Sequence, residues 1–300
     1  MPRRRILHVA LAALAVALFA AACGGGEPSG ETTAAPGGTE TVSPPTTGGE
    51  TETGETETEL PAETITLSVY FLRGEKIGVA HRQVPKTQAV GRAALEQLLA
   101  GPTDAEAEAG LHSEIPEGTE LLDLAIEGGV ATVDLSGEYD DGGGSLAMFT
   151  RLAQVVYTLT QFPTVEGVTF QLDGEPVQTF SGEGIVLDQP QTRAGYEDVT
   201  PAILVESPAV GDTVSSPLHV TGSANTFEAT FLANVVDWDG RIVAEQVVTA
   251  TCGTGCRGTF DVTIPFEWSG EPRGALIVLE QSAEDGSPIN VVEIPLAFER

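Results

Sequence analysis

Apolar and polar residues follow two different rhythms in the first half of the chain. Residues 65–72 and 168–172 alternate with a period of two, which predicts strands. Residues 87–100 and 145–161 carry apolar side chains three and four positions apart, which predicts helices. Residues 120–135 alternate on both sides of a Gly-Gly pair and predict a hairpin. The resulting order, β-α-β-β-α-β, indicates an α+β domain with a mixed sheet that has its helices on one face.

The second half of the chain contains short apolar segments and no helical pattern. Turn signals separate the segments, among them Ser207-Pro208 and the hairpin turn Asp237-Trp238-Asp239-Gly240. Seven short strands in one stretch, without a helix, predict an all-β immunoglobulin-like sandwich. The predicted strands are residues 203–206, 218–222, 227–238, 243–250, 258–264, 275–282 and 290–297.

The first 22 residues have the composition of a secretory signal peptide. Three arginines precede an apolar run, residues 6–22, and small residues end it. The run has 17 residues, fewer than the roughly 20 that a membrane span needs. Cys23 follows at once, as in bacterial lipoproteins, which the segment resembles although Ala20 stands where those signals usually have Leu. The resemblance implies a diacylglyceryl group on Cys23, and a cleaved signal peptide without lipid is the alternative.

The next segment, residues 24–63, has almost no apolar side chain. It holds nine acidic residues and no Lys or Arg, so it cannot bury enough surface to offset the entropy of ordering. We predict a disordered acidic stalk with a root-mean-square span of roughly 35 Å. The predicted organisation is a signal peptide at 1–22, the stalk at 23–63, the α+β domain at 64–189, a linker at 190–200 and the sandwich at 201–300.

Charge and cysteine content narrow the partners and the compartment. Without the three arginines of the signal peptide, the chain has 11 basic and 44 acidic residues. Nucleic acid and anionic lipid headgroups are poor partners for so negative a chain, because binding either would need a positively charged face. Cys252 and Cys256 form an even pair in an exported chain, which predicts a disulfide. The three residues between them differ from the redox Cys-x-x-Cys spacing.

No segment carries the pattern of a catalytic or metal site. Nucleophile elbows, Ser-x-x-Lys and zinc-protease motifs are missing from the sequence, and carboxylate pairs in so acidic a chain single out no glycosidase site. His81, His112 and His219 lie in separate segments and predict surface or turn positions. Residues 140–144, Asp-Asp-Gly-Gly-Gly, suit either a cation loop or a polar loop before a helix, with Ser145 as N-cap. We predict no catalytic residue, no metal site and no cofactor.

An ordered set of short motifs in residues 65–180 resembles the GerMN domain of bacterial sporulation and germination proteins. The carriers are Tyr70-Phe71 and residues 98–102, 113–121, 131–136, 154–162 and 168–176. Residues 201–299 resemble the immunoglobulin-like domain that often accompanies GerMN, through residues 206–208, 216–222, 227–229 and 258–260. The resemblance implies an envelope protein that acts through protein–protein contact and has no known enzymatic chemistry.

Three functional hypotheses follow. The first is a non-enzymatic lipoprotein on the outer face of the bacterial cell membrane, anchored through Cys23, that binds an envelope protein; a role in sporulation or germination rests on the resemblance only. The second is a module that binds peptidoglycan or another wall polysaccharide, for which Trp238, Trp268 and Tyr139 are the candidate aromatics. The third, a cell-wall hydrolase, has no supporting motif.

Overall fold

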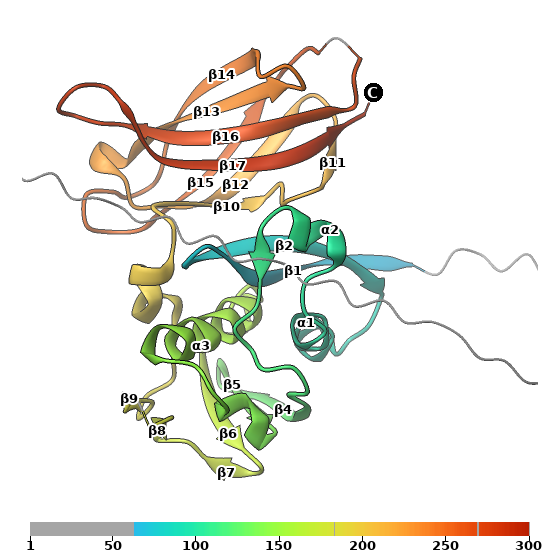
Figure 1. Ribbon diagram of the computed structural model, residues 1–300, viewed down its shortest axis with the longest axis vertical. Coiled ribbons are helices and arrows are strands. Elements are labelled where there is room, and N and C mark those ends of the chain that lie inside the picture. Colours follow the sequence, from blue (N-terminus) through green and yellow to red (C-terminus); the bar gives the residue numbers. More distant parts are fainter. Residues whose placement is uncertain (1–62, 183, 269, 300) are drawn as a thin grey trace, which may run out of the picture. The chain divides into compact units, whose positions relative to one another are not determined.

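The computed structural model describes residues 63–182, 184–268 and 270–299 (Figure 1). The predicted signal peptide, Cys23 and the stalk up to residue 62 lie outside the described residues. Within the described part of the chain, no helix is long and apolar enough to cross a membrane. We call residues 64–189 the α+β half and residues 201–299 the sandwich.

The first sheet of the α+β half is a long hairpin with a short third strand. β1 (Thr64–Arg73) and β2 (Lys76–Pro85) pair antiparallel over their whole length, and β3 (Leu111–His112) pairs with the end of β1. β2 is not predicted from the sequence. Gly78 and the consecutive polar residues His81, Arg82 and Gln83 interrupt its alternation, so only the pairing with β1 makes it a strand.

The second sheet is the mixed sheet that the sequence predicts. β4 (Leu121–Glu127) and β5 (Val130–Leu135) are antiparallel, whereas β5 and β6 (Gly167–Leu172) are parallel, and β7 (Glu175–Pro176) follows. The α+β fold class is thereby confirmed. The prediction of a single sheet is wrong, because β1 pairs with β2 and β3 in a sheet of its own.

Two helices separate these sheets, as Figure 1 shows. α1 (Val90–Leu99) contacts β1 and β4, and α3 (Ser145–Leu159) contacts β1, β2 and β6. With a sheet on each side, α3 is buried almost all round from Met148 onward. The predicted N-cap is wrong by one residue, since Gly144 caps α3 and Ser145 begins it. The smaller elements are α2 (Asp104–Glu108), η1 (Gly137–Asp140), β8 (Thr179–Phe180) and β9 (Ile185–Val186).

The sandwich consists of two sheets, and each of the seven predicted strands is present. One sheet has the order β10-β12-β15 and the other β11-β17-β16-β13-β14. Their inner faces share one core, in which Phe231 packs edge-on against Phe260. β10 and β12 lie very close, because a Cβ added to Gly222 would be 2.1 Å from the carbonyl oxygen of Leu204. The bounds are β10 (Ile203–Ser207), β11 (Thr213–Val214), β12 (Leu218–Ala224), η3 (Phe227–Ala229), β13 (Thr230–Asp237), β14 (Ile242–Thr249), β15 (Gly258–Ile264), β16 (Arg273–Gln281) and β17 (Pro288–Phe298).

The segment predicted as a linker, residues 190–200, is packed structure. It forms η2 (Arg193–Val199), and the side chains of Tyr196 and Val199 are buried. Tyr196 packs against Phe149 of α3, with ring centroids 4.8 Å apart. The connection between the two halves is therefore anchored on the α+β half.

Candidate functional site

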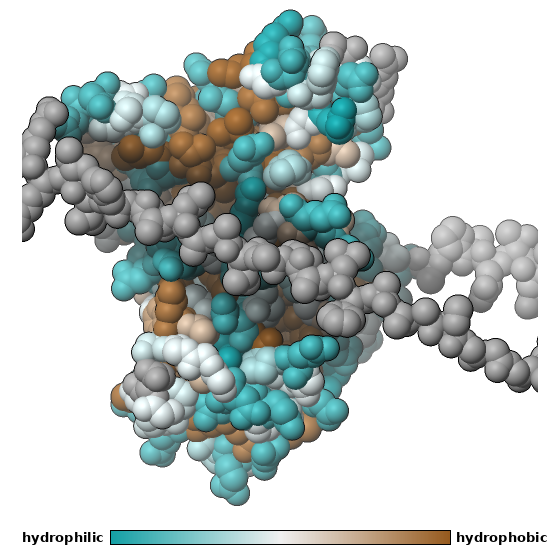
Figure 2. All heavy atoms as spheres, viewed as in Figure 1, coloured by the Kyte–Doolittle hydropathy of each residue, from teal (hydrophilic) through white to brown (hydrophobic). Residues whose placement is uncertain are grey.

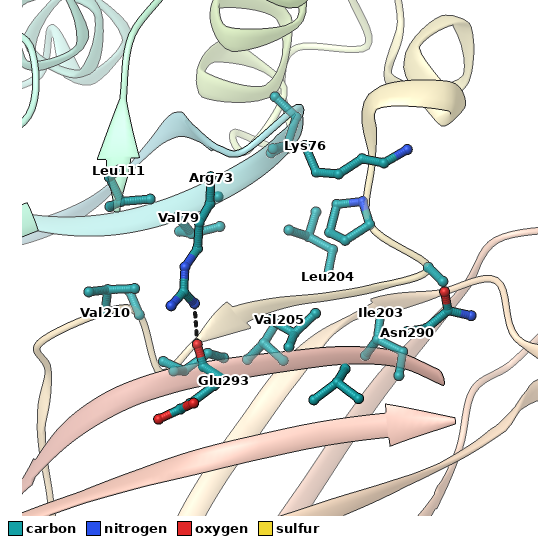
Figure 3. Close-up of a pocket in the computed structure, with 18 of the residues that line it drawn as sticks. Arg73, Lys76, Val79, Leu111, Ile203, Leu204, Val205, Val210, Asn290 and Glu293 are labelled. Carbon is teal, nitrogen blue, oxygen red and sulfur yellow. Dashed lines mark hydrogen bonds between the residues drawn. The ribbon is translucent and has the colours of Figure 1, made fainter. Parts of the chain in front are cut away.

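Three edge strands, one from each of three sheets, meet where the α+β half contacts the sandwich. β2 and β10 are the outermost strands of their sheets. β17 is paired with β11 only at Ala297 and Phe298, so its earlier residues have no strand on that side. Between the three strands lies a cleft with a volume of about 520 Å³ (Figure 3). We call it the junction cleft.

The junction cleft has apolar walls and a few polar groups. β2 contributes Ile77 and Val79, β10 contributes Val205, and β17 contributes Val292. Arg73, at the end of β1, points across the cleft and donates a hydrogen bond to the backbone oxygen of Glu293 (Figure 3). Lys76, the first residue of β2, donates to the backbone oxygen of Asp198. Both cations thus use backbone oxygens that belong to other segments.

Beside the cleft, a polar cluster joins both halves to η2. Arg193 donates to Oε1 of Glu206 at 2.7 Å and to the hydroxyl of Tyr70 at 3.1 Å. It also donates to Oγ1 of Thr160 at 2.9 Å and to the backbone oxygen of Tyr157 at 3.2 Å. The hydroxyl of Tyr70 donates to Glu206. We call this cluster the Arg193 clamp, because one guanidinium binds groups on β1, α3 and β10.

Aromatic rings surround the Arg193 guanidinium. Its Cζ lies 4.6 Å from the ring centroid of Tyr157 and 5.1 Å from that of Tyr70. Burial raises the pKa of Tyr70 far above the usual value, and Glu206 raises it further, while Arg193 opposes the shift. Burial alone would lower the pKa of Arg193, but Tyr70 and Glu206 outweigh it and the pKa is raised. The cluster therefore holds a neutral Tyr70 and a charged Arg193–Glu206 pair.

Two further contacts cross the junction. The ring of His81 on β2 has Nδ1 2.7 Å from Oδ2 of Asp212 and Nε2 3.0 Å from the backbone oxygen of Glu206. The prediction of a surface or turn position is therefore wrong for His81, which lies in a strand against the sandwich. Arg257 pairs with both oxygens of Glu197, at 2.8 and 2.9 Å, and the hydrogen bond from Arg257 lowers the pKa of that carboxyl. His219 instead pairs with Asp261 on the exposed surface.

The loop predicted either to bind a cation or to lead into α3 is held by an arginine of the chain itself. Arg151 donates to the backbone oxygens of Tyr139, Asp141 and Gly142. Burial raises the pKa of Asp140, although Arg151 opposes the shift. Within the part of the chain that the structure describes, no group of three metal-ligating side chains exists. Arg151 thus holds the loop from within the chain, as a polar loop before α3 would be held, and the lack of a metal site stays a prediction.

The two other predicted features differ in outcome. Cys252 and Cys256 face each other with Cα atoms 5.8 Å apart, which suits a disulfide, and the pairing stays a prediction. The aromatic platform for sugars is not formed, because Tyr139 is completely buried. Trp268 packs against Phe266 and Phe298, so Trp238 alone among the three candidates is well exposed.

A second surface becomes visible only in the structure. Strand pairing brings outward-facing residues of β13, β14, β16 and β17 into rows on the side of the five-stranded sheet that does not face the core. Such a side is normally polar, but here apolar side chains dominate, and Figure 2 shows apolar residues gathered over this part of the sandwich. We call it the outer sheet face; its apolar members are Leu232, Val236, Ile242, Val247, Ala275, Ile277, Leu279 and Pro295.

Sequence reasoning missed both the Arg193 clamp and the outer sheet face. A signal for the clamp exists, since Arg193 is one of only 12 arginines in the chain and lies in an otherwise uncharged part of the predicted linker, residues 189–195. The outer sheet face has a weaker signal. Its strands, such as residues 275–279, are continuously apolar instead of alternating, which is typical of a strand that is covered on both sides.

Comparison with known proteins assigns both halves. The Germane family model, described as "Sporulation and spore germination", matches residues 68–178. The Gmad2 model, described as "Immunoglobulin-like domain of bacterial spore germination", matches residues 202–287. No curated protein matches the chain. Neither matched family is a known enzyme family.

Three solved structures are similar at a distance. The first GerMN domain of the sporulation protein GerM from Bacillus subtilis is 21% identical, with a TM-score of 0.39, over 44% of this chain and 99% of that one. The tandem GerMN domains of the same protein are 16% identical, with a TM-score of 0.40, and the match covers 70% of this chain and 64% of that one. A putative lipoprotein from Clostridium perfringens is 23% identical, with a TM-score of 0.32, and the match covers 44% of this chain and 89% of that one. The two family matches identify a GerMN-type domain in the first half, followed by an immunoglobulin-like domain of the type found in bacterial spore germination proteins.

Proposed function

We propose that this chain is a non-enzymatic, lipid-anchored extracytoplasmic protein that binds another protein of the bacterial envelope. The observation that carries the proposal is the outer sheet face. Val247 is 61% exposed and Ile242 is 51% exposed; they lie in rows with the half-buried Leu232 and the buried Val236. Contiguous apolar surface of this kind on a soluble domain marks an interaction site.

Charge determines which partner fits the outer sheet face. Glu245 and Glu293 stand among the apolar side chains, whereas Asn234 at the centre is buried. A second copy of the chain would bring the same carboxylates together, and the formal net charge of −30 adds to the repulsion. The surface therefore suits a protein with an apolar patch and basic groups around it.

The glycan hypothesis has less support from the geometry. Sugar sites use exposed aromatic side chains, and Trp238 is the only one of the three predicted aromatics that is mostly exposed. Trp238 lies in the β13–β14 turn, and the turn, which also contains Gly240, holds no second aromatic side chain that could stack on a sugar. Retention on a purified wall would nevertheless be a direct sign of that function, so it is measured alongside.

The substitution Val247→Glu tests the proposed surface. It places a charge on the outer sheet face, and we expect a loss of at least tenfold in binding, because an unpaired charge in an apolar interface is strongly unfavourable. The matched control is Val186→Glu, since Val186 is also 61% exposed but lies on β9 of the α+β half.

The measurement is capture of envelope proteins by the full chain, followed by direct titration of the captured protein in purified form. We expect the wild type and Val186→Glu to bind the captured protein, and Val247→Glu to bind it at least tenfold more weakly. Equal binding by both variants would contradict it. Sedimentation of the wild type with purified wall, in the absence of a protein partner, would favour the glycan hypothesis instead.

The anchor is tested separately by Cys23→Ser. Two acyl chains give stable membrane attachment, so we expect the wild type in the membrane fraction and the variant in the soluble extracytoplasmic fraction. Labelling of the wild type, but not of the variant, with a radioactive fatty acid is the second expected result. If both proteins are released and neither is labelled, a cleaved signal without lipid is correct.

A further inference from the structure

The junction cleft has the dimensions and position of a ligand site. Its volume of about 520 Å³ falls within the range of roughly 300–1,000 Å³ that is usual for small-molecule sites. It lies at the contact between two folded halves, where such sites are common. Its walls combine many apolar side chains with few polar groups, which is the usual composition of these sites.

The apolar walls come from all three edge strands. Val292 of β17 lines the cleft, and Figure 3 shows Val79 of β2, Val205 of β10 and Val210 around the same space. Val291, at the edge of the same cleft, is 53% exposed. Val79 and Val205 are already buried, so the apolar surface that a ligand would newly cover belongs mainly to Val291, with smaller parts from Val210 and Val292.

The charge in the cleft is positive, in contrast to the rest of the chain. Arg73 and Lys76 line it, and their hydrogen bonds go to uncharged backbone oxygens. Among the described residues, neither cation forms an ion pair, whereas Arg82, Arg193 and Arg257 each pair with a carboxylate. The uncompensated charge of Arg73 and Lys76 favours an anion.

The nearby carboxylates leave this charge available. Glu293 is the acidic residue that lines the cleft, and its carboxylate points away from Arg73 in Figure 3. Glu197 lies close enough to Lys76 for its pKa to be lowered, but Arg257 contributes the largest part of that shift and occupies both oxygens of Glu197.

We propose that the junction cleft binds a small amphipathic anion, a molecule with a carboxylate or phosphate group on an apolar body. The head group would lie at Arg73, and the apolar body would lie between β2, β10 and β17. The ammonium of Lys76 points away from Arg73, toward η2, and would add attraction at longer range (Figure 3). This site adjoins the outer sheet face at Glu293 but shares none of its apolar members, and it does not depend on the partner proposed there. A free fatty acid and a lipid-derived phosphate have the same chemistry, and the experiment distinguishes them.

The test is calorimetric titration of the full chain with four probes below their micelle concentrations. Dodecanoate and dodecyl phosphate are the anions, and dodecyltrimethylammonium and dodecanol are the cationic and neutral controls. We expect one molecule of at least one anion to bind per chain, at least tenfold more tightly than either control. Whichever anion binds more tightly identifies the head group. Binding of neither anion, or equal binding of the cation, would overturn the proposal.

Two variants locate the binding. Arg73→Gln with Lys76→Gln removes both cations, and Val291→Asp adds a negative charge at the edge of the cleft without opening the core; each is expected to weaken binding at least tenfold. The matched control is Arg241→Gln with Arg273→Gln, which changes the net charge equally at exposed positions outside the cleft. Equal affinity in the cleft variants and the control would show that the anion binds elsewhere. The Val247→Glu variant should bind the anion like the wild type, so the two proposals can fail independently.

Discussion

Replacing Arg151 by Met should destabilise the protein by about 3–5 kcal/mol, the largest effect that we expect of a single substitution here. Arg151 is only 2% exposed, in the middle of α3. Its guanidinium donates to the backbone oxygens of Glu114, Tyr139, Asp141 and Gly142, which arrive from two separate loops. Without it, the buried carbonyl of Tyr139 loses its partner, and an unsatisfied buried acceptor costs about 1–3 kcal/mol. The three part-buried carbonyls lose a charged donor as well, and the uncharged Met cannot replace it.

Urea denaturation, followed by circular dichroism, measures this effect. The matched control is Arg92→Met, because Arg92 is more exposed, on α1, and pairs with Asp123 at 3.6 Å. Exposed pairs of that kind contribute about 0.2–1 kcal/mol. A further variant, Arg151→Lys, keeps the charge but not the planar fork that reaches several carbonyls, so its loss should fall between those of Met and the wild type. A difference of less than 1 kcal/mol between Arg151→Met and the control would show that water replaces the guanidinium.

Arg151 also shows how far the sequence could predict this fold. The apolar spacing of residues 145–161 is enough to predict α3, and its core positions, such as Leu152 and Val156, are buried as that spacing implies. The same pattern places Arg151 beside an apolar stripe and says nothing of its partners. Those partners are the carbonyls of residues 114, 139, 141 and 142, which tertiary packing brings to it. Apolar periodicity alone therefore cannot predict which polar residues of a helix are buried or what they bind.

The single predicted sheet fails for a related reason. Alternation in residues 65–72 shows that β1 is a strand, but its neighbours depend on pairing at long range. The strand that pairs with it, β2, has a weak pattern because Arg82 turns toward α2 and pairs with Glu106 there. Because β2 is not predicted, the strands of the other sheet are the only predicted partners left for β1. The local sequence pattern thus predicts most of the individual helices and strands. Which strands pair into one sheet depends on long-range contacts, including those of a few charged residues.

The candidate site was the least predictable part. The junction cleft needs the relative position of β2, β10 and β17, which are far apart in the chain. No motif of the sequence carries that information, since edge strands are defined by the absence of a neighbour. The outer sheet face is different: its continuous apolar strands are present in the sequence, but they are equally typical of strands that are buried on both sides.

Replacing Arg193 by Met should loosen the contact between the two halves and destabilise the protein by about 2–3 kcal/mol. The estimate is below that for Arg151, because the side chains of Arg193 and Glu206 are 27% and 28% exposed and water screens their pair. The variant leaves Glu206 with Tyr70 and without its cation, and it removes the guanidinium from the rings of Tyr70 and Tyr157. We expect one cooperative unfolding transition for the wild type and two for the variant.

Scanning calorimetry distinguishes this result from a general loss of stability. Arg241→Met is the matched control, since Arg241 is exposed in the β13–β14 turn, and it should keep one transition at the wild-type temperature. Glu206→Gln keeps an acceptor for Tyr70 and Arg193 but removes the charge, so its loss should be smaller than that of Arg193→Met. In the double variant the two losses should be less than additive, because both substitutions remove the same ion pair. Full additivity, or one unshifted transition in Arg193→Met, would mean that the Arg193 clamp does not hold the halves together and that the apolar contacts of η2 do so instead.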